Sequence, residues 1–142
     1  MSVAPAQDFI GVYPDLISPD RCQALMKQFD LSQHAVPGHV GGGLMPELKN
    51  SRDIQLNKHP QWQAVEKELN TAMFRALMQY VREYPYAMIA PLMLQFHTND
   101  GKVRRIEIGD FNNMDEKALA DLLRAVFRPG AINLQRYEAN EG

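Results

Sequence analysis

The chain has very little cysteine and no long apolar run. Cys22 is the only cysteine among the 142 residues, which excludes an internal disulfide and a zinc site built from several cysteines. No apolar stretch approaches the roughly 20 residues that cross a bilayer. The first ten residues also lack the basic segment and long apolar segment of an export signal. We therefore expect a cytoplasmic protein with no membrane partner.

An excess of charge of one sign is missing too. Lys and Arg total 15 against 17 for Asp and Glu, and the formal net charge is -2. Because binding to phosphates needs a clustered positive excess, nucleic acid is not an expected partner. With 45% hydrophobic residues, a chain of this length is expected to form a single domain over residues 1–142 with one core.

The common catalytic and ligand-binding motifs are absent as well. None of the four histidines stands in a His-x-Asp, His-x-Glu or His-Glu-x-x-His arrangement, so no metal ligand is predicted. The triple glycine Gly41-Gly42-Gly43 lacks the spacing of a phosphate-binding loop, and no Gly-x-Ser-x-Gly occurs. We assign no catalytic residue. The four histidines are His34, His39, His59 and His97.

The hydrophobic pattern predicts helices and strands in mixed order. Short strands are expected where β-branched and aromatic residues cluster or alternate with polar ones, and helices where apolar residues recur every three or four positions. The predicted strands are Phe9–Tyr13, Arg52–Leu56, Leu92–His97, Val103–Ile108 and Ala131–Tyr137. The predicted helices begin at Ser18-Pro19-Asp20, after Pro60 and after Asp115, and end near Leu31, Tyr84 and Arg128. This pattern predicts an α+β fold with three helices packed on a small, mainly antiparallel sheet.

Three local features complete these expectations. Cys22 falls on the apolar stripe of the first helix with Leu25, Met26 and Phe29, so we expect a buried, unreactive thiol. Val36–Gly43 is rich in glycine and is interpreted as a mobile surface loop whose role is open. A two-residue Asp100-Gly101 turn is expected within Thr98–Lys102, between two antiparallel strands.

Several segments together resemble a bacterial iron(II)- and 2-oxoglutarate-dependent oxygenase of the prolyl-4-hydroxylase-like kind. The early ones are Phe9–Tyr13, Ser18–Cys22, Val36-Pro37-Gly38 with its following glycines, and Lys49–Asp53; the later ones are Tyr80–Tyr86 and, most specifically, Arg128–Tyr137. The resemblance implies a double-stranded β-helix (cupin-like) and Fe(II) held by two histidines and a carboxylate. It also implies that 2-oxoglutarate decarboxylation is coupled to hydroxylation of a protein side chain or small molecule. Tyr137 matches the position from which a phenol would hydrogen-bond the co-substrate.

The sequence departs from this family in one decisive respect. The resemblance places the first iron ligand shortly after Tyr137, in a His-x-Asp or His-x-Glu pair, and no such pair occurs. We therefore expect the chain to be the amino-terminal portion of such an oxygenase, without most of the catalytic barrel and without Fe(II) or 2-oxoglutarate bound. Alone it would be inactive, and the open edge of its last strand would favour a homodimer. The alternative is a non-catalytic α+β binding or interaction module.

Overall fold

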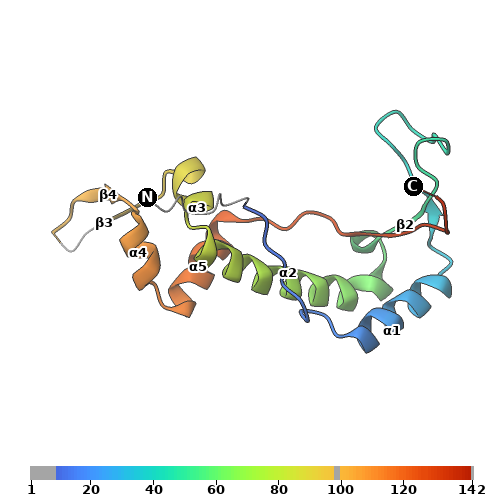
Figure 1. Ribbon diagram of the computed structural model, residues 1–142, viewed down its shortest axis with the longest axis horizontal. Helices are drawn as coiled ribbons and strands as arrows, with labels where there is room; N and C mark the ends of the chain where they lie inside the picture. The colour runs from blue at the N-terminus through green and yellow to red at the C-terminus, as the bar shows by residue number, and fades with distance from the viewer. Residues whose placement is uncertain (1–8, 98–99, 142) are drawn as a thin grey trace, which may run out of the picture. The chain divides into compact units, whose positions relative to one another are not determined.

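The computed structural model describes residues 9–97 and 100–141, and it divides into two compact units (Figure 1). One unit comprises the residues up to Leu16 together with Met73–Arg128, and the other comprises Ile17–Ala72 together with Pro129–Gly142. The helix α2, Gln63–Glu83, belongs to both units. Its residues up to Ala72 lie in the unit with Ile17, and those from Met73 lie in the unit with Arg128. We call the unit with Met73–Arg128 the helical unit and the unit with Ile17–Ala72 the sheet unit. The prediction of a single domain stays a prediction.

The sheet unit is built on three antiparallel strands in the order β1-β2-β5. The register pairs Val36 with Asp53 and, on the other side of β2, Asp53 with Gln135. Around this sheet the chain forms one α-helix, two short 3-10 helices and the start of α2. The bounds are α1 Pro19–Asp30, β1 Val36–Pro37, β2 Arg52–Gln55, η1 Leu56–Lys58, η2 Pro60–Trp62 and β5 Asn133–Arg136.

Local signals account for the helix α1. The Ser18 hydroxyl accepts a hydrogen bond from the Arg21 amide at 3.2 Å, and Pro19 occupies the first helical position, where a missing N–H costs nothing. The predicted helix is therefore confirmed, with its end at Asp30. The predicted burial of its whole apolar stripe is wrong, because Cys22 is exposed and Met26 is 67% exposed.

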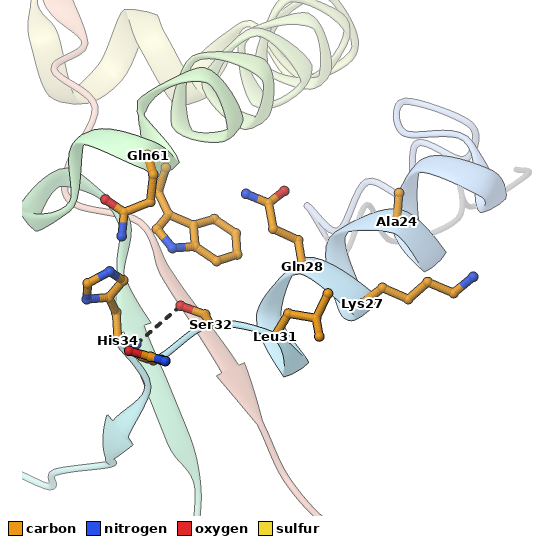
Figure 2. Close-up of a pocket in the computed structure, with 9 residues that line it drawn as sticks. Ala24, Lys27, Gln28, Leu31, Ser32, His34 and Gln61 are labelled. Carbon is orange, nitrogen blue, oxygen red and sulfur yellow. Dashed lines mark hydrogen bonds between the residues drawn. The ribbon is translucent and has the colours of Figure 1, made fainter.

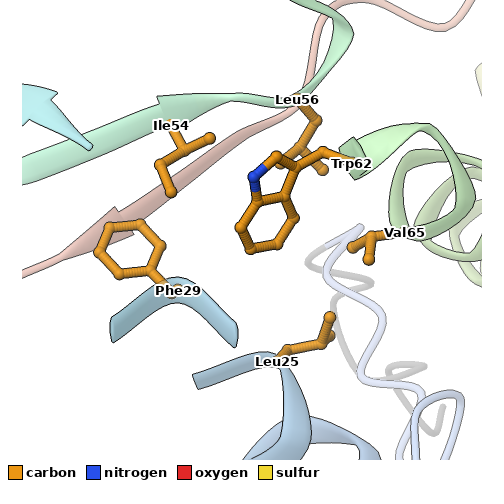
Figure 3. Packing of buried hydrophobic residues seen from close by; sticks show 6 residues of the cluster. All are labelled: Leu25, Phe29, Ile54, Leu56, Trp62 and Val65. Carbon is orange, nitrogen blue, oxygen red and sulfur yellow. The ribbon is translucent and has the colours of Figure 1, made fainter. Parts of the chain in front are cut away.

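A compact hydrophobic core lies against one face of this sheet (Figure 3). Trp62, at the end of η2, is 1% exposed, and its indole lies between the strand residues Ile54 and Leu56 and the helix α1. Ile54 and Leu56 are both fully buried, which follows from their spacing of two along an extended segment. The remaining buried members of the cluster are Leu25, Phe29 and Val65.

The helical unit has its own core, made by the end of α2 and the helices after it. Among the described residues it contains α3 Tyr86–Leu92, β3 Gln95–His97, β4 Val103–Arg105, α4 Ile108–Asn113 and α5 Glu116–Val126. The helix α5 was predicted and is capped by the Asp115 carboxylate, which accepts from the Ala118 amide at 2.7 Å. The strands β3 and β4 confirm the predicted hairpin in shortened form, although Thr98 and Asn99 of its turn lie outside the described residues. The buried residues of this core are Val81, Met88, Ile106, Phe111, Leu119 and Leu123.

The predicted strand at Phe9–Tyr13 is wrong. This segment is irregular, because it forms no strand ladder, and side-chain hydroxyls bind its carbonyls instead. The Tyr80 hydroxyl donates to the Phe9 carbonyl at 2.9 Å, and the Tyr84 hydroxyl lies 3.5 Å from the Ile10 carbonyl. The Phe9 ring contacts the Tyr84 ring, with centroids 5.5 Å apart, whereas Ile10 and Val12 remain exposed.

The predicted α+β class is confirmed, with corrections to its details. In residues 9–97 and 100–141 the strands form a three-stranded and a two-stranded sheet, not one sheet, and neither closes into a barrel. Two short α-helices, α3 and α4, were not predicted. No helix in the described part of the chain is both long and apolar enough to cross a membrane.

Candidate functional site

The face of the sheet that lies opposite the core carries a connected group of polar side chains. Asp53 on β2 is its centre: the Lys49 ammonium lies 2.7 Å from Oδ2 and the Ser51 hydroxyl donates to Oδ1 at 2.7 Å. Gln135, the partner of Asp53 on β5, donates its side-chain amide to Oδ2 at 3.1 Å. We call these four residues, Lys49, Ser51, Asp53 and Gln135, the Asp53 network.

Three members of the Asp53 network, Lys49, Ser51 and Asp53, are largely shielded from water, whereas Gln135 is exposed. The side chains of Lys49 and Asp53 are only 16% and 15% exposed, and Ser51 is buried. Burial opposes ionisation of the Asp53 carboxyl, but hydrogen bonds from Lys49, Ser51 and Gln135 and the attraction of the Lys49 charge outweigh it. Together these interactions hold the pKa of Asp53 below its ordinary value. The network thus keeps an ionised carboxylate on the sheet at neutral pH.

The glycine-rich segment closes against this network. The Gly38 amide donates to the Ser51 carbonyl at 2.8 Å, and a methyl group placed on Gly38 would lie 2.1 Å from the Ser51 hydroxyl. Only glycine therefore fits here without a shift of Ser51. The interpretation of Val36–Gly43 as a surface loop is wrong at its start, since Val36 and Pro37 form β1 and Gly38 is buried.

A hollow of about 480 Å³ runs between α1 and β5 on the sheet unit. Its apolar wall consists of Leu25, Met26, Phe29 and Leu134, and its polar wall of Asp30, Gln135, Arg136 and Tyr137. Arg136 forms an ion pair with Asp30 at 3.0 Å and another with Glu138, so its charge is already balanced by carboxylates. The hollow thus combines an apolar wall with a polar wall whose side chains accept and donate hydrogen bonds.

Tyr137, the one predicted co-substrate residue, lines this hollow. It follows β5 directly, and its side chain is 41% exposed. It comes two residues after Gln135, the spacing that puts two side chains on one face of an extended strand. Its predicted hydrogen bond to a co-substrate stays a prediction.

A second hollow of about 630 Å³ lies beside the end of α1 (Figure 2). It is lined by long polar side chains such as Lys27, Gln28 and Gln61, and the His34 amide donates to the Ser32 hydroxyl at 3.2 Å. The ring of His34 stacks on that of His59, with centroids 4.3 Å apart and planes inclined by 28°. The pairing of these two histidines was not predicted, because they are 25 positions apart in sequence.

This stack does not form a metal site. A metal ion lies in the plane of each imidazole that binds it, and two rings stacked 4.3 Å apart share no such point ~2.1 Å from a nitrogen of each. Within residues 9–97 and 100–141, moreover, no three His, Cys, Asp or Glu side chains lie close enough together to hold a metal ion. The expectation that this chain carries none of the iron ligands stays a prediction.

Comparison with protein-family models, with curated proteins and with solved structures finds no match to this chain. The geometry of the sheet unit is thus the only structural guide to function. The sequence signal for the Asp53 network was present in part, because Ser51 and Asp53 are spaced by two and share a strand face. The signal for Gln135 was absent, since it depends on pairing between strands 82 residues apart.

Proposed function

We propose that this chain is the amino-terminal support of a prolyl-4-hydroxylase-like iron(II)- and 2-oxoglutarate-dependent oxygenase. One observation carries the proposal beyond the resemblance of the sequence. Two of the segments that resemble the family, Lys49–Asp53 and Arg128–Tyr137, supply neighbouring antiparallel strands whose polar residues Asp53 and Gln135 bind each other. Segments that are far apart in the chain thus build one polar sheet face, as expected for the start of a barrel wall.

In this proposal the double-stranded β-helix is completed by residues beyond those of the two sheets described above. Fe(II) would be held by such residues, in keeping with the absence of a His-x-Asp or His-x-Glu pair from the sequence. The contribution of this chain is a rigid polar surface and the Tyr137 phenol, which would donate a hydrogen bond to a carboxylate or keto oxygen of 2-oxoglutarate. The substrate would be hydroxylated as 2-oxoglutarate is decarboxylated to succinate.

The test begins with the gene. We expect the DNA that follows the Gly142 codon to encode a His-x-Asp or His-x-Glu pair within about fifteen residues in some reading frame. A chain extended through that frame should form succinate from 2-oxoglutarate in the presence of Fe(II). Absence of the ligand pair would rule the proposal out.

A variant pair then tests Tyr137. Tyr137→Phe in the extended chain should raise the KM for 2-oxoglutarate several-fold, because it removes one hydrogen bond to a charged or polar oxygen. Tyr86→Phe is the matched control, since Tyr86 is an exposed tyrosine of the helical unit at 59% exposure. Equal KM values for both variants and the unchanged chain would exclude the Tyr137 role.

The second candidate is a non-catalytic binding module, which the hollow between α1 and β5 favours. It predicts that the chain unfolds cooperatively and remains fully functional in partner binding without any metal. Calorimetric titration with 2-oxoglutarate and a redox-inert divalent ion should give no heat of binding under this candidate. Tight metal binding by the 142 residues would contradict both candidates.

A further inference from the structure

We propose that the outer edge of β5 binds the same edge of a second copy of this chain, with the two-fold axis at Leu134. This inference concerns the described chain alone, because a further strand added to β5 in a completed barrel would use the same backbone groups. It rests on the hydrogen-bond pattern of the three-stranded sheet, on the difference between its two edges, and on the side chains that the pairing would bring together.

The direction of each backbone group on β5 follows from one backbone hydrogen bond and the register. The Leu56 amide donates to the Ile132 carbonyl at 2.9 Å, so these residues form a hydrogen-bonded pair that extends the β2–β5 ladder. In an antiparallel ladder such pairs alternate with non-bonded ones. The backbone groups of Ile132, Leu134 and Arg136 therefore point toward β2, and those of Asn133 and Gln135 point to the outer edge.

That outer edge is accessible in the described structure. Among the described residues, β5 pairs with β2 and with no other strand. Asn133 and Gln135 are both exposed. Each therefore presents one N–H and one C=O in the plane of the sheet, which is the arrangement that accepts another strand.

The opposite edge of the sheet is protected. The Gly38 amide bonds the Ser51 carbonyl, so Gly38 and Ser51 are a hydrogen-bonded pair and Pro37, opposite Arg52, is in a non-bonded pair. Pro37 thus turns its ring nitrogen, which has no hydrogen, to the outside of β1. Proline at such a position blocks strand addition. With a single open edge, pairing between copies ends at a dimer and does not extend into a fibre.

A two-fold axis at Leu134 makes the two edges complementary. It places Asn133 opposite the partner's Gln135, so the outward groups exchange four backbone hydrogen bonds and the two amide side chains lie side by side. It places Leu134 opposite the partner's Leu134. Each leucine, only partly buried in a single chain, would then be covered by the other. Arg136 lies opposite the partner's Ile132, so no two like charges face each other directly. An axis at Arg136 would set two guanidinium groups opposite each other and is disfavoured.

The interface is short, so the association should be weak. β5 has four residues, and the contact falls below the roughly 1,200 Å² of a standard stable interface. We expect sedimentation equilibrium to show a monomer at about 10 µM and a growing dimer fraction toward about 1 mM. A chain that remains monomeric at about 1 mM would overturn the proposal.

Two variants of one residue isolate the backbone contribution. Gln135→Pro removes the outward N–H and leaves the bonds to β2 intact, whereas Gln135→Ala keeps the N–H; both lose the side-chain bond to Asp53. Proline should weaken dimerisation roughly tenfold or more, since a dimer loses two hydrogen bonds, and alanine should change it far less. Equal dimerisation of the two variants would contradict the assigned edge.

A measurement on the unchanged chain covers the case in which the proline variant does not fold. Amide hydrogen exchange of Asn133 and Gln135 should slow as the protein concentration rises, because only the dimer protects these amides. Exchange of the Leu134 and Arg136 amides, which point to β2, should be slow at every concentration. Protection of Asn133 and Gln135 that does not depend on concentration would show that the chain covers its own edge, and it would refute the dimer.

Discussion

Replacing Asp53 with asparagine tests the Asp53 network most directly. The change keeps the shape of the side chain but removes its charge, and it substitutes an amide N–H₂ for one of two oxygens. In the unchanged chain both oxygens of Asp53 accept hydrogen bonds, Oδ1 from Ser51 and Oδ2 from Lys49 and Gln135. An asparagine could turn its N–H₂ toward the Ser51 hydroxyl, which can also accept, and keep its oxygen for Lys49 and Gln135. The Lys49 ammonium would nevertheless lose its counter-ion.

The size of the effect follows from burial. Removing one partner of a fully buried ion pair costs about 3–5 kcal/mol, because the other charge is left without compensation. Here Lys49 and Asp53 remain 16% and 15% exposed, so water screens part of that cost. We expect Asp53→Asn to lower the free energy of unfolding by about 2–3 kcal/mol at pH 7.

Urea unfolding followed by tryptophan fluorescence measures this change. Trp62 is the only tryptophan, and it packs with Ile54, which neighbours Asp53 on β2. The double variant Lys49→Met, Asp53→Leu is the control, because it removes both charges together and should lie within about 1 kcal/mol of the unchanged chain. A loss below about 0.5 kcal/mol for Asp53→Asn would refute the view that the network is buried and ionised.

The pH dependence gives a second check with a defined sign. Because the pKa of Asp53 is lowered in the folded state, its contribution is complete above the ordinary carboxyl pKa of about 4 and is lost as the pH falls through the folded value. The difference in unfolding free energy between the unchanged chain and Asp53→Asn should therefore shrink steadily below about pH 4. A difference that is constant between pH 7 and pH 3 would contradict an ionised Asp53.

Three further predictions concern single positions. Gly38→Ala should destabilise the chain by about 1–3 kcal/mol, because the new methyl group meets Ser51, whereas Gly41→Ala, with open space around it, should have little effect in the same urea titration. Cys22 should react with a thiol reagent in the folded chain at a rate close to that of the unfolded chain, and strong protection would contradict its exposure. Ser18→Ala should cost about 1 kcal/mol through loss of the α1 cap, and an unchanged unfolding midpoint would argue against that hydrogen bond.

The sequence predicted best those elements that local signals define. The starts of α1 and α5 were read from Ser18 and Asp115, and the structure confirms both caps. The long periodic run after Pro60 predicted a helix that ends near Tyr84, and the structure confirms it as α2, which ends at Glu83. Caps and helical periodicity depend on neighbours within one or two turns, so a single sequence is enough to recognise them.

Short elements were missed because their signals are weak or were assigned to a neighbour. The helix α4 has six residues, too few for a periodic stripe, and Ile108 was placed in the preceding strand. Glu107 and Asp110 form a capping box in the structure, but Glu-x-x-Asp is not the usual Ser/Thr-x-x-Glu/Gln pattern from which a helix start is predicted. Pro85 correctly marked the end of α2, yet it also begins α3 as its N-cap.

Burial was overestimated wherever it depends on partners far away in the chain. The stripe of α1 contains four apolar positions, but the sheet unit covers only Leu25 and Phe29, and Cys22 and Met26 stay exposed. The same limit applies to the candidate site. Gln135 joins Asp53 only because β5 pairs with β2 in one register, and a shift by one residue would turn Gln135 to the core face.

The composition of the two sheet faces bears on why the Asp53 network exists. One face buries Ile54 and packs Leu134, and it supplies ordinary hydrophobic stabilisation. The other face holds an ion pair that apolar residues of similar volume could replace with little loss of stability. A sheet that needed only stability would gain nothing from this arrangement, so the network is better explained by a role in function or in fixing the β2–β5 register. The double variant of Lys49 and Asp53 separates these roles: a register role predicts a stable chain with altered β5 amide exchange, and a functional role predicts unchanged exchange and lost activity in the extended protein.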